Sequence, residues 1–98
     1  MNITSDDFAV CNAGTPHEMY NARYILNEYT MSLSYGGMAY GSGFWNKSDG
    51  TTGGSFEVCV WNTATGDTLP ADDGENVRGW MSPDQVHALA QQILDGDI

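Results

Sequence analysis

The stretch from Met81 to Gly96 has the pattern of an amphipathic helix with both ends marked, and it constrains the fold more than any other feature. Ser82 is a helix cap, Pro83 follows at the first helical position, and Gln85 can reach back to the amide of the cap. Gly96 supplies the stop. The apolar residues recur at helical spacing: Val86, Leu89, Ala90, Ile93 and Leu94. A helix with one apolar stripe needs a surface to cover, so we expect a sheet from the middle of the chain.

The length of 98 residues predicts one domain, 1–98, that buries roughly 60–65% of its unfolded surface. No apolar run approaches the roughly 18 residues that cross a bilayer, and no basic segment followed by an apolar one suggests a signal peptide. We therefore expect a soluble protein in the cytoplasm. Cys11 and Cys59 lie far apart, and in this setting two buried free thiols are expected.

Charge is the unusual feature of the composition. Thirteen acidic residues stand against three basic ones, which gives a net charge of −10. Such a surface repels nucleic acid phosphates and anionic lipids, so direct binding to nucleic acid or to a membrane is disfavoured. A basic protein partner is the natural complement.

The first half of the chain predicts two strands and a short helix. Alternation around Phe8 and Val10 favours a strand at about 7–11. Thr15, Pro16 and Glu18 repeat the capping pattern of the C-terminal helix, which predicts a short helix over 16–24. Residues 27–35 then alternate as a strand, although the apolar positions there would also suit a longer helix.

The Gly36-Gly37 pair fits a two-residue hairpin turn. That turn would place Tyr35 opposite Met38, Leu33 opposite Tyr40, and Tyr29 opposite Phe44. Gly41 and Gly43 leave the second strand thin, which indicates a bulge, a strong twist or the close approach of another element.

The second half predicts a polar loop over 46–54 and a strand over 55–62. Phe56, Val58 and Val60 would share one face of that strand, and Glu57, Cys59 and Trp61 the other. An acidic connection over 63–74 precedes a short strand at about 76–81 that leads into the helix. The fold class is therefore α+β: an antiparallel sheet of four to five strands with the C-terminal amphipathic helix packed on one face and a short N-terminal helix.

The densest acidic segment contains Asp72, Asp73 and Glu75, with Asp67 and Asp84 near it in sequence. It can be read as a solvated loop, as an acidic patch that faces a protein partner, or as a calcium site, although the spaced ligands of a calcium loop are missing. Trp61 beside acidic residues is a plausible interface anchor. The candidate partner-binding residues are Asp67, Asp72, Asp73, Glu75, Asp84 and Trp61.

Motifs for chemistry are missing from the sequence. The two cysteines, His17 and His87 do not have zinc-ligand spacing, and both histidines are expected to be solvated. Gly41-Ser42-Gly43 is not a nucleophile elbow, and the glycine-rich stretches lack the lysine of a phosphate-binding loop. We expect no catalytic residues, no metal, no cofactor and no enzymatic activity.

In size, charge and paucity of lysine, the whole chain resembles the small acidic inhibitors encoded by phages and mobile elements, namely anti-CRISPR and anti-restriction proteins of the DNA-mimic type. The resemblance rests on no shared motif. It implies an inhibitor whose carboxylates replace phosphates in a basic groove of a nucleic-acid-binding complex. The alternative is a phage accessory or assembly protein that binds its partner through an aromatic face of the sheet.

Overall fold

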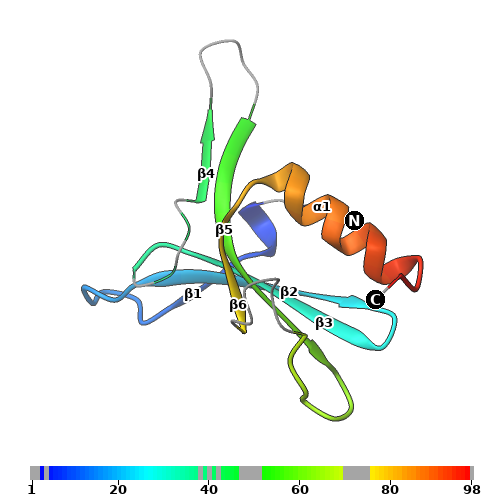
Figure 1. The fold of residues 1–98 in the computed structure, drawn as a ribbon. Coiled ribbons are helices and arrows are strands. Elements are labelled where there is room, and N and C mark those ends of the chain that lie inside the picture. The colour runs from blue at the N-terminus through cyan, green and yellow to red at the C-terminus, as the bar shows by residue number, and fades with distance from the viewer. Residues whose placement is uncertain are drawn as a thin grey trace.

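The computed structural model describes residue 3 and residues 5–37, 39, 41, 43–46, 52–69 and 76–97. It is an α+β fold in which one helix lies across an antiparallel sheet (Figure 1). The described elements, in chain order, are a 3-10 turn η1 (Ser5–Asp7), β1 (Ala9–Cys11), β2 (Met19–Leu26), β3 (Tyr29–Tyr35), β4 (Gly43–Asn46), β5 (Thr52–Asn62), β6 (Val77–Met81) and α1 (Pro83–Leu94).

The sheet is organised around β5. On one side β5 pairs with β3, which pairs with β2, which in turn pairs with β1; on the other side it pairs with β6. The start of β5 extends beyond this sheet and pairs with β4, so that the two strands project together from the body (Figure 1). All these pairs are antiparallel, as expected from the sequence.

Helix α1 has the predicted ends. Ser82 Oγ accepts a hydrogen bond from the Gln85 amide at 3.2 Å, and the Gln85 side chain accepts one from the Ser82 amide at 2.9 Å. At the other end Gly96 adopts φ 78°, its amide donates to Ile93, and the Asp97 amide donates to Gln92. These bonds form the glycine-based stop known as a Schellman motif.

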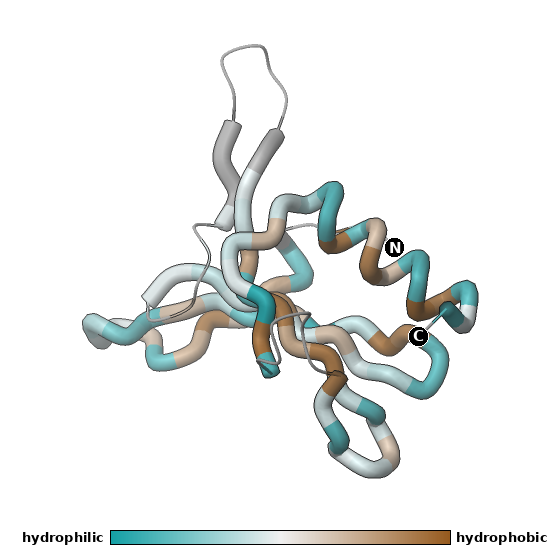
Figure 2. Tube along the Cα trace, viewed as in Figure 1, coloured by the Kyte–Doolittle hydropathy of each residue, from teal (hydrophilic) through white to brown (hydrophobic). Residues whose placement is uncertain are grey.

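The core lies between α1 and one face of the sheet. Figure 2 shows the hydrophobic residues of α1 turned toward the strands. Leu94 was predicted to belong to this stripe but is exposed, since it lies at the edge of the helix face. The buried set is Ala22, Leu26, Met31, Leu33, Phe56, Val58, Val60, Val86, Leu89, Ala90 and Ile93.

The predicted helix over 16–24 is wrong, because most of that segment belongs to strand β2. The capping groups serve a tight turn instead: Thr15 Oγ1 accepts from the His17 amide at 3.2 Å, and Glu18 accepts from the Gly14 amide at 3.0 Å. From Met19 onward, pairing with both β1 and β3 satisfies the backbone and buries Ala22 and Leu26. Long-range pairing therefore overrides the local helix signal.

The predicted hairpin at Gly36-Gly37 is also wrong. Residues 29–35 do form a strand, but β3 pairs with β2 through a turn at Asn27 and Glu28, in which Asn27 has φ 55°. The other edge of β3 pairs with β5, and β4 also pairs with β5, so Tyr29 lies opposite Asn62 rather than Phe44. The predicted partners Met38 and Tyr40 lie outside the described residues.

Of the three alternatives predicted for Gly41 and Gly43 (a bulge, a strong twist or the close approach of another element), the structure shows close approach. A Cβ atom on Gly41 would lie 2.7 Å from the Phe56 Cα and 2.9 Å from the Glu57 amide nitrogen. A Cβ atom on Gly43 would lie 2.5 Å from the Tyr35 ring. Glycine is therefore required here because the segment after β3 passes directly over the middle of β5.

We predict that Gly41→Ala lowers the free energy of unfolding by about 2–3 kcal/mol, since the added methyl group meets backbone atoms rather than a flexible side chain. Gly66→Ala is the matched control: its φ is 78°, but a Cβ there would meet nothing within 4 Å. It should cost only about 1 kcal/mol, from backbone strain alone. Urea denaturation of both variants measures the difference, and equal losses would contradict the close approach.

Candidate functional site

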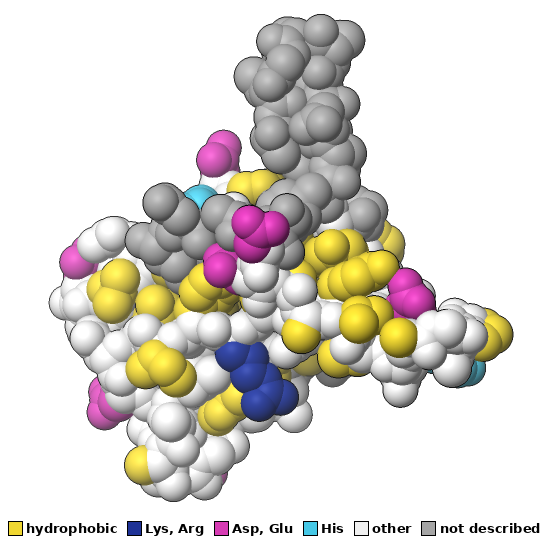
Figure 3. Space-filling model, turned by 180° about the vertical axis from the view of Figure 1, so that it is seen from behind, with side chains coloured by type: hydrophobic (Ala, Val, Ile, Leu, Met, Phe, Trp, Pro, Cys, Tyr) yellow, Lys and Arg dark blue, Asp and Glu magenta, His cyan; other side chains and the backbone are white. Residues whose placement is uncertain are grey.

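The face of the sheet opposite α1 carries polar and amphipathic side chains, and we call it the helix-free face. Figure 3 views the molecule from behind; on the side shown, basic side-chain atoms lie among hydrophobic groups. Side chains alternate between the two faces along β2, β3 and β5, and this alternation determines which residues lie on the helix-free face. The sequence predicted the alternation in β5. The residues of the helix-free face are Asn21, Arg23 and Ile25 of β2, Thr30, Ser32 and Ser34 of β3, and Glu57, Cys59 and Trp61 of β5.

Hydrogen bonds order the small polar side chains of this face. Asn21 Nδ2 donates to Ser32 Oγ at 2.7 Å, to Ser34 Oγ at 2.9 Å and to the Leu33 carbonyl at 3.1 Å. Thr30 Oγ1 lies 2.7 Å from Thr63 Oγ1. The polar groups of β3 are thus satisfied within the protein, which favours a rigid surface over a reactive one.

Trp61, the aromatic residue predicted as an anchor, is half-buried. The guanidinium carbon of Arg23 lies 5.4 Å from the centre of its ring. Arg23 is paired with Ser32 and Trp61 with Thr30, so the arginine reaches diagonally across β3. One cation of this protein therefore already uses the indole of Trp61.

Cys59 lies on the same face, between Glu57 and Trp61. Burial, and to a lesser degree the Glu57 carboxylate, raise the pKa of the Cys59 thiol, while Arg78 opposes the shift. Both cysteines are free, and both are partly rather than fully buried. A thiol whose pKa is raised is a poor nucleophile at neutral pH, so Cys59 lacks the electrostatics of a catalytic cysteine.

Trp80 is an exposed aromatic residue that the sequence analysis did not single out as a candidate. Strand β6 contains a bulge: Phe56 pairs with Met81 and Val58 with Arg78, so Gly79 and Trp80 together lie opposite the single residue Glu57. Trp80 has φ 56°, and 61% of its surface is exposed. Gly79 inside a short strand was the available signal, because a glycine there often marks a bulge.

The predicted acidic site is only partly within the described structure. Asp72, Asp73 and Glu75 lie outside the described residues. Asp67 and Asp84 are both exposed, but the structure does not bring them together. The Asp67 carbonyl accepts a hydrogen bond from the Asn62 amide, at the end of β5. Asp84 lies three residues after Met81, which pairs with Phe56. Phe56 and Asn62 are about 20 Å apart along β5.

A different group of carboxylates lies at the C-terminal end of α1. The side-chain amide of Asn27 donates to the Leu94 carbonyl at 3.2 Å, which brings the β2–β3 turn to this helix end. Glu28, Asp95 and Asp97 are all exposed there, and no basic residue occupies the last turn. Since a helix C-terminus carries partial negative charge, this end is electrostatically unfavourable on its own.

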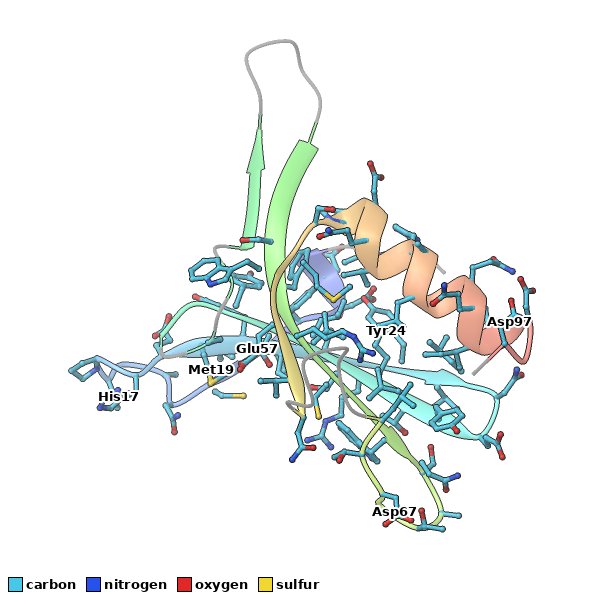
Figure 4. The ribbon with its side chains drawn as sticks, in the orientation of Figure 1. His17, Met19, Tyr24, Glu57, Asp67 and Asp97 are labelled. Carbon is cyan, nitrogen blue, oxygen red and sulfur yellow. The ribbon has the colours of Figure 1, made fainter. Side chains whose placement is uncertain are left out.

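Within the described ranges, no group of three or more metal-binding side chains converges, and no helix is long and apolar enough to cross a membrane. His17 and His87 are both exposed, as predicted. Figure 4 shows His17, Asp67 and Asp97 at separate ends of the molecule.

Comparison with known proteins adds no relative to this geometry: no family model, no curated protein and no solved structure matches the chain.

We predict that the rate of Cys59 alkylation, measured in a Cys11→Ser variant, still rises with pH above 9.0, the ordinary pKa of a thiol. Burial and the Glu57 carboxylate disfavour the thiolate and so raise its pKa. Mass spectrometry after timed exposure to iodoacetamide measures the rate. Adding Glu57→Gln should move the profile toward lower pH, since one of the two causes is removed. A rate that levels off below pH 9.0 would contradict the assignment.

Proposed function

We propose that the protein is a non-enzymatic inhibitor that binds a basic, nucleic-acid-binding protein or complex and blocks it through its acidic surface. The observation that carries the proposal is the exposed and poorly compensated negative charge. The described carboxylates that are exposed belong to several elements and turns: Asp6, Asp7, Glu28, Asp67, Asp84, Asp95 and Asp97.

The positions of the basic residues support this reading. Only three are present against 13 acidic ones, and Arg23 lies over Trp61 with no ion pair to a described carboxylate. The negative charge of the surface is thus left to interact with a partner. An acidic field of this kind accelerates encounter with a basic surface and repels nucleic acid itself.

The DNA-mimic form of the proposal assigns the contact to the acidic connection before β6. Asp67, Asp72, Asp73, Glu75 and Asp84 would occupy positions where the partner expects phosphates. The separation of Asp67 from Asp84 fits an extended line of charges along a groove rather than one compact site.

The charge proposal predicts that Asp72→Asn, Asp73→Asn and Glu75→Gln together weaken partner binding by more than about tenfold and leave the fold intact. The partner is first captured from host-cell lysate with tagged protein, eluted with a salt gradient and identified by mass spectrometry. The purified pair is then measured by titration calorimetry.

A matched variant separates a local contact from net charge. Asp6→Asn, Glu28→Gln and Asp97→Asn remove the same number of charges from other elements. If both triple variants lose affinity equally, the charge acts only at long range; if neither does, the acidic connection is not the contact.

The alternative function is an accessory or assembly protein that binds its partner through the aromatic part of the sheet. The exposure of Ile25 at 67%, beside the Arg23–Trp61 pair on the helix-free face, favours it.

The alternative predicts that Trp61→Ala weakens partner binding by more than about tenfold, with little dependence on salt, because apolar contacts are not screened. Binding that resists Trp61→Ala but weakens as salt rises would contradict it and favour the inhibitor.

A further inference from the structure

We propose that Trp80 is the anchor of the protein-binding surface and that it takes a cationic side chain, arginine or lysine, of the partner between its indole face and the Glu57 carboxylate. This inference rests on the proposed binding to a basic protein and adds the residue and the kind of contact.

The backbone at Trp80 is the first observation. A left-handed φ of 56° is strained for a bulky side chain, and glycine is the residue that adopts it freely. Gly79 is the neighbouring residue, yet the strained position holds the tryptophan. Strain of this kind persists where the surrounding structure imposes it, and it gathers at sites of function.

The exposure of the indole is the second observation. Trp80 is 61% exposed, so its ring adds little to the core, which lies beneath the neighbouring Met81. A bulge changes the direction in which a strand presents its side chains. Here the chain bears backbone strain and holds a large aromatic ring in solvent, a combination that stability alone does not explain.

The surroundings of Trp80 point to a cation. Glu57 is the residue opposite the bulge, and its carboxylate has no hydrogen bond within the described part of the chain. Asp84 follows four residues after Trp80, in the first turn of α1. An indole and a carboxylate at facing positions of two paired strands can together bind arginine or lysine, through both the ring and the opposite charge.

Trp61 provides the comparison within the same molecule. Its ring already lies against Arg23, whereas no described ring or cation contacts Trp80. Among the described residues, therefore, Trp61 has a cation over its ring and Trp80 does not. A basic protein partner supplies the missing group.

The test is titration with a nona-arginine peptide at low salt, using ¹⁵N-labelled full-length protein and the indole N–H signals of Trp45, Trp61 and Trp80. We expect the Trp80 signal to shift most and to saturate. Trp80→Gly should weaken peptide binding by more than about tenfold, and Glu57→Gln by about threefold, since the contact with the ring remains in the second variant. Val10→Ala, at an exposed apolar residue of β1 that has no part in either proposal, should stay within about twofold of the wild type.

Folding is checked on the same samples by thermal denaturation. Trp80→Gly should melt at or above the wild-type temperature, because glycine adopts the left-handed conformation without strain. Trp80→Asn, which also tolerates that conformation, is the second variant and should lose binding to the same extent.

The outcomes separate this inference from the proposed function. If Trp80→Gly binds the peptide as the wild type does while the Asp72→Asn, Asp73→Asn, Glu75→Gln variant does not, the anchor is wrong and the acidic surface remains the site. If the wild type itself does not bind the peptide at low salt, both proposals are overturned.

Discussion

The structure depends on the burial of one face of β5. Phe56, Val58 and Val60 are fully buried, with α1 above them, β3 on one side and β6 on the other. Phe56 also stacks on Phe8 at a centroid distance of 5.7 Å, which ties the start of the chain to the same core. A strand with neighbours on both sides and a helix across one face holds the other elements in position.

The two halves of β5 differ in their surroundings. The second half has Glu57, Cys59 and Trp61 on the helix-free face, where Asn21 is hydrogen-bonded to Ser32 and Arg23 lies over Trp61. At the level of Phe56 the chain is crowded: Gly41 passes over β5 and the bulge in β6 accommodates Gly79 and Trp80. The position of the bulge follows from how β6 is joined to the helix, whereas the tryptophan at its left-handed position adds little to the core. Met81 must reach the core, and Ser82 must cap α1 directly afterwards.

Charge and packing are divided between different parts of the molecule. The core contains no Asp, Glu, Lys or Arg among its described buried residues, and most of the described carboxylates lie in η1, in turns or at the ends of α1, with Glu57 on β5. Negative charge at the C-terminal end of α1, on Asp95 and Asp97, opposes the helix dipole. A basic side chain would be the stabilising choice at this position, so the end of the helix carries uncompensated negative charge.

Local signals determined those parts of the fold whose physics is local. The cap at Ser82, the stop at Gly96 and the alternation of β5 could all be read from the sequence, because each depends on residues a few positions apart. Tertiary structure decided the rest. Residues 16–24 carry helix-start residues, but pairing with β1 and β3 makes most of them a strand, and β3 pairs with β2 and β5 rather than across Gly36-Gly37. Trp80 was hidden for the same reason: Gly79 indicated a possible bulge, but the left-handed backbone and the exposure of Trp80 depend on the register of β6 on β5, which is a long-range pairing.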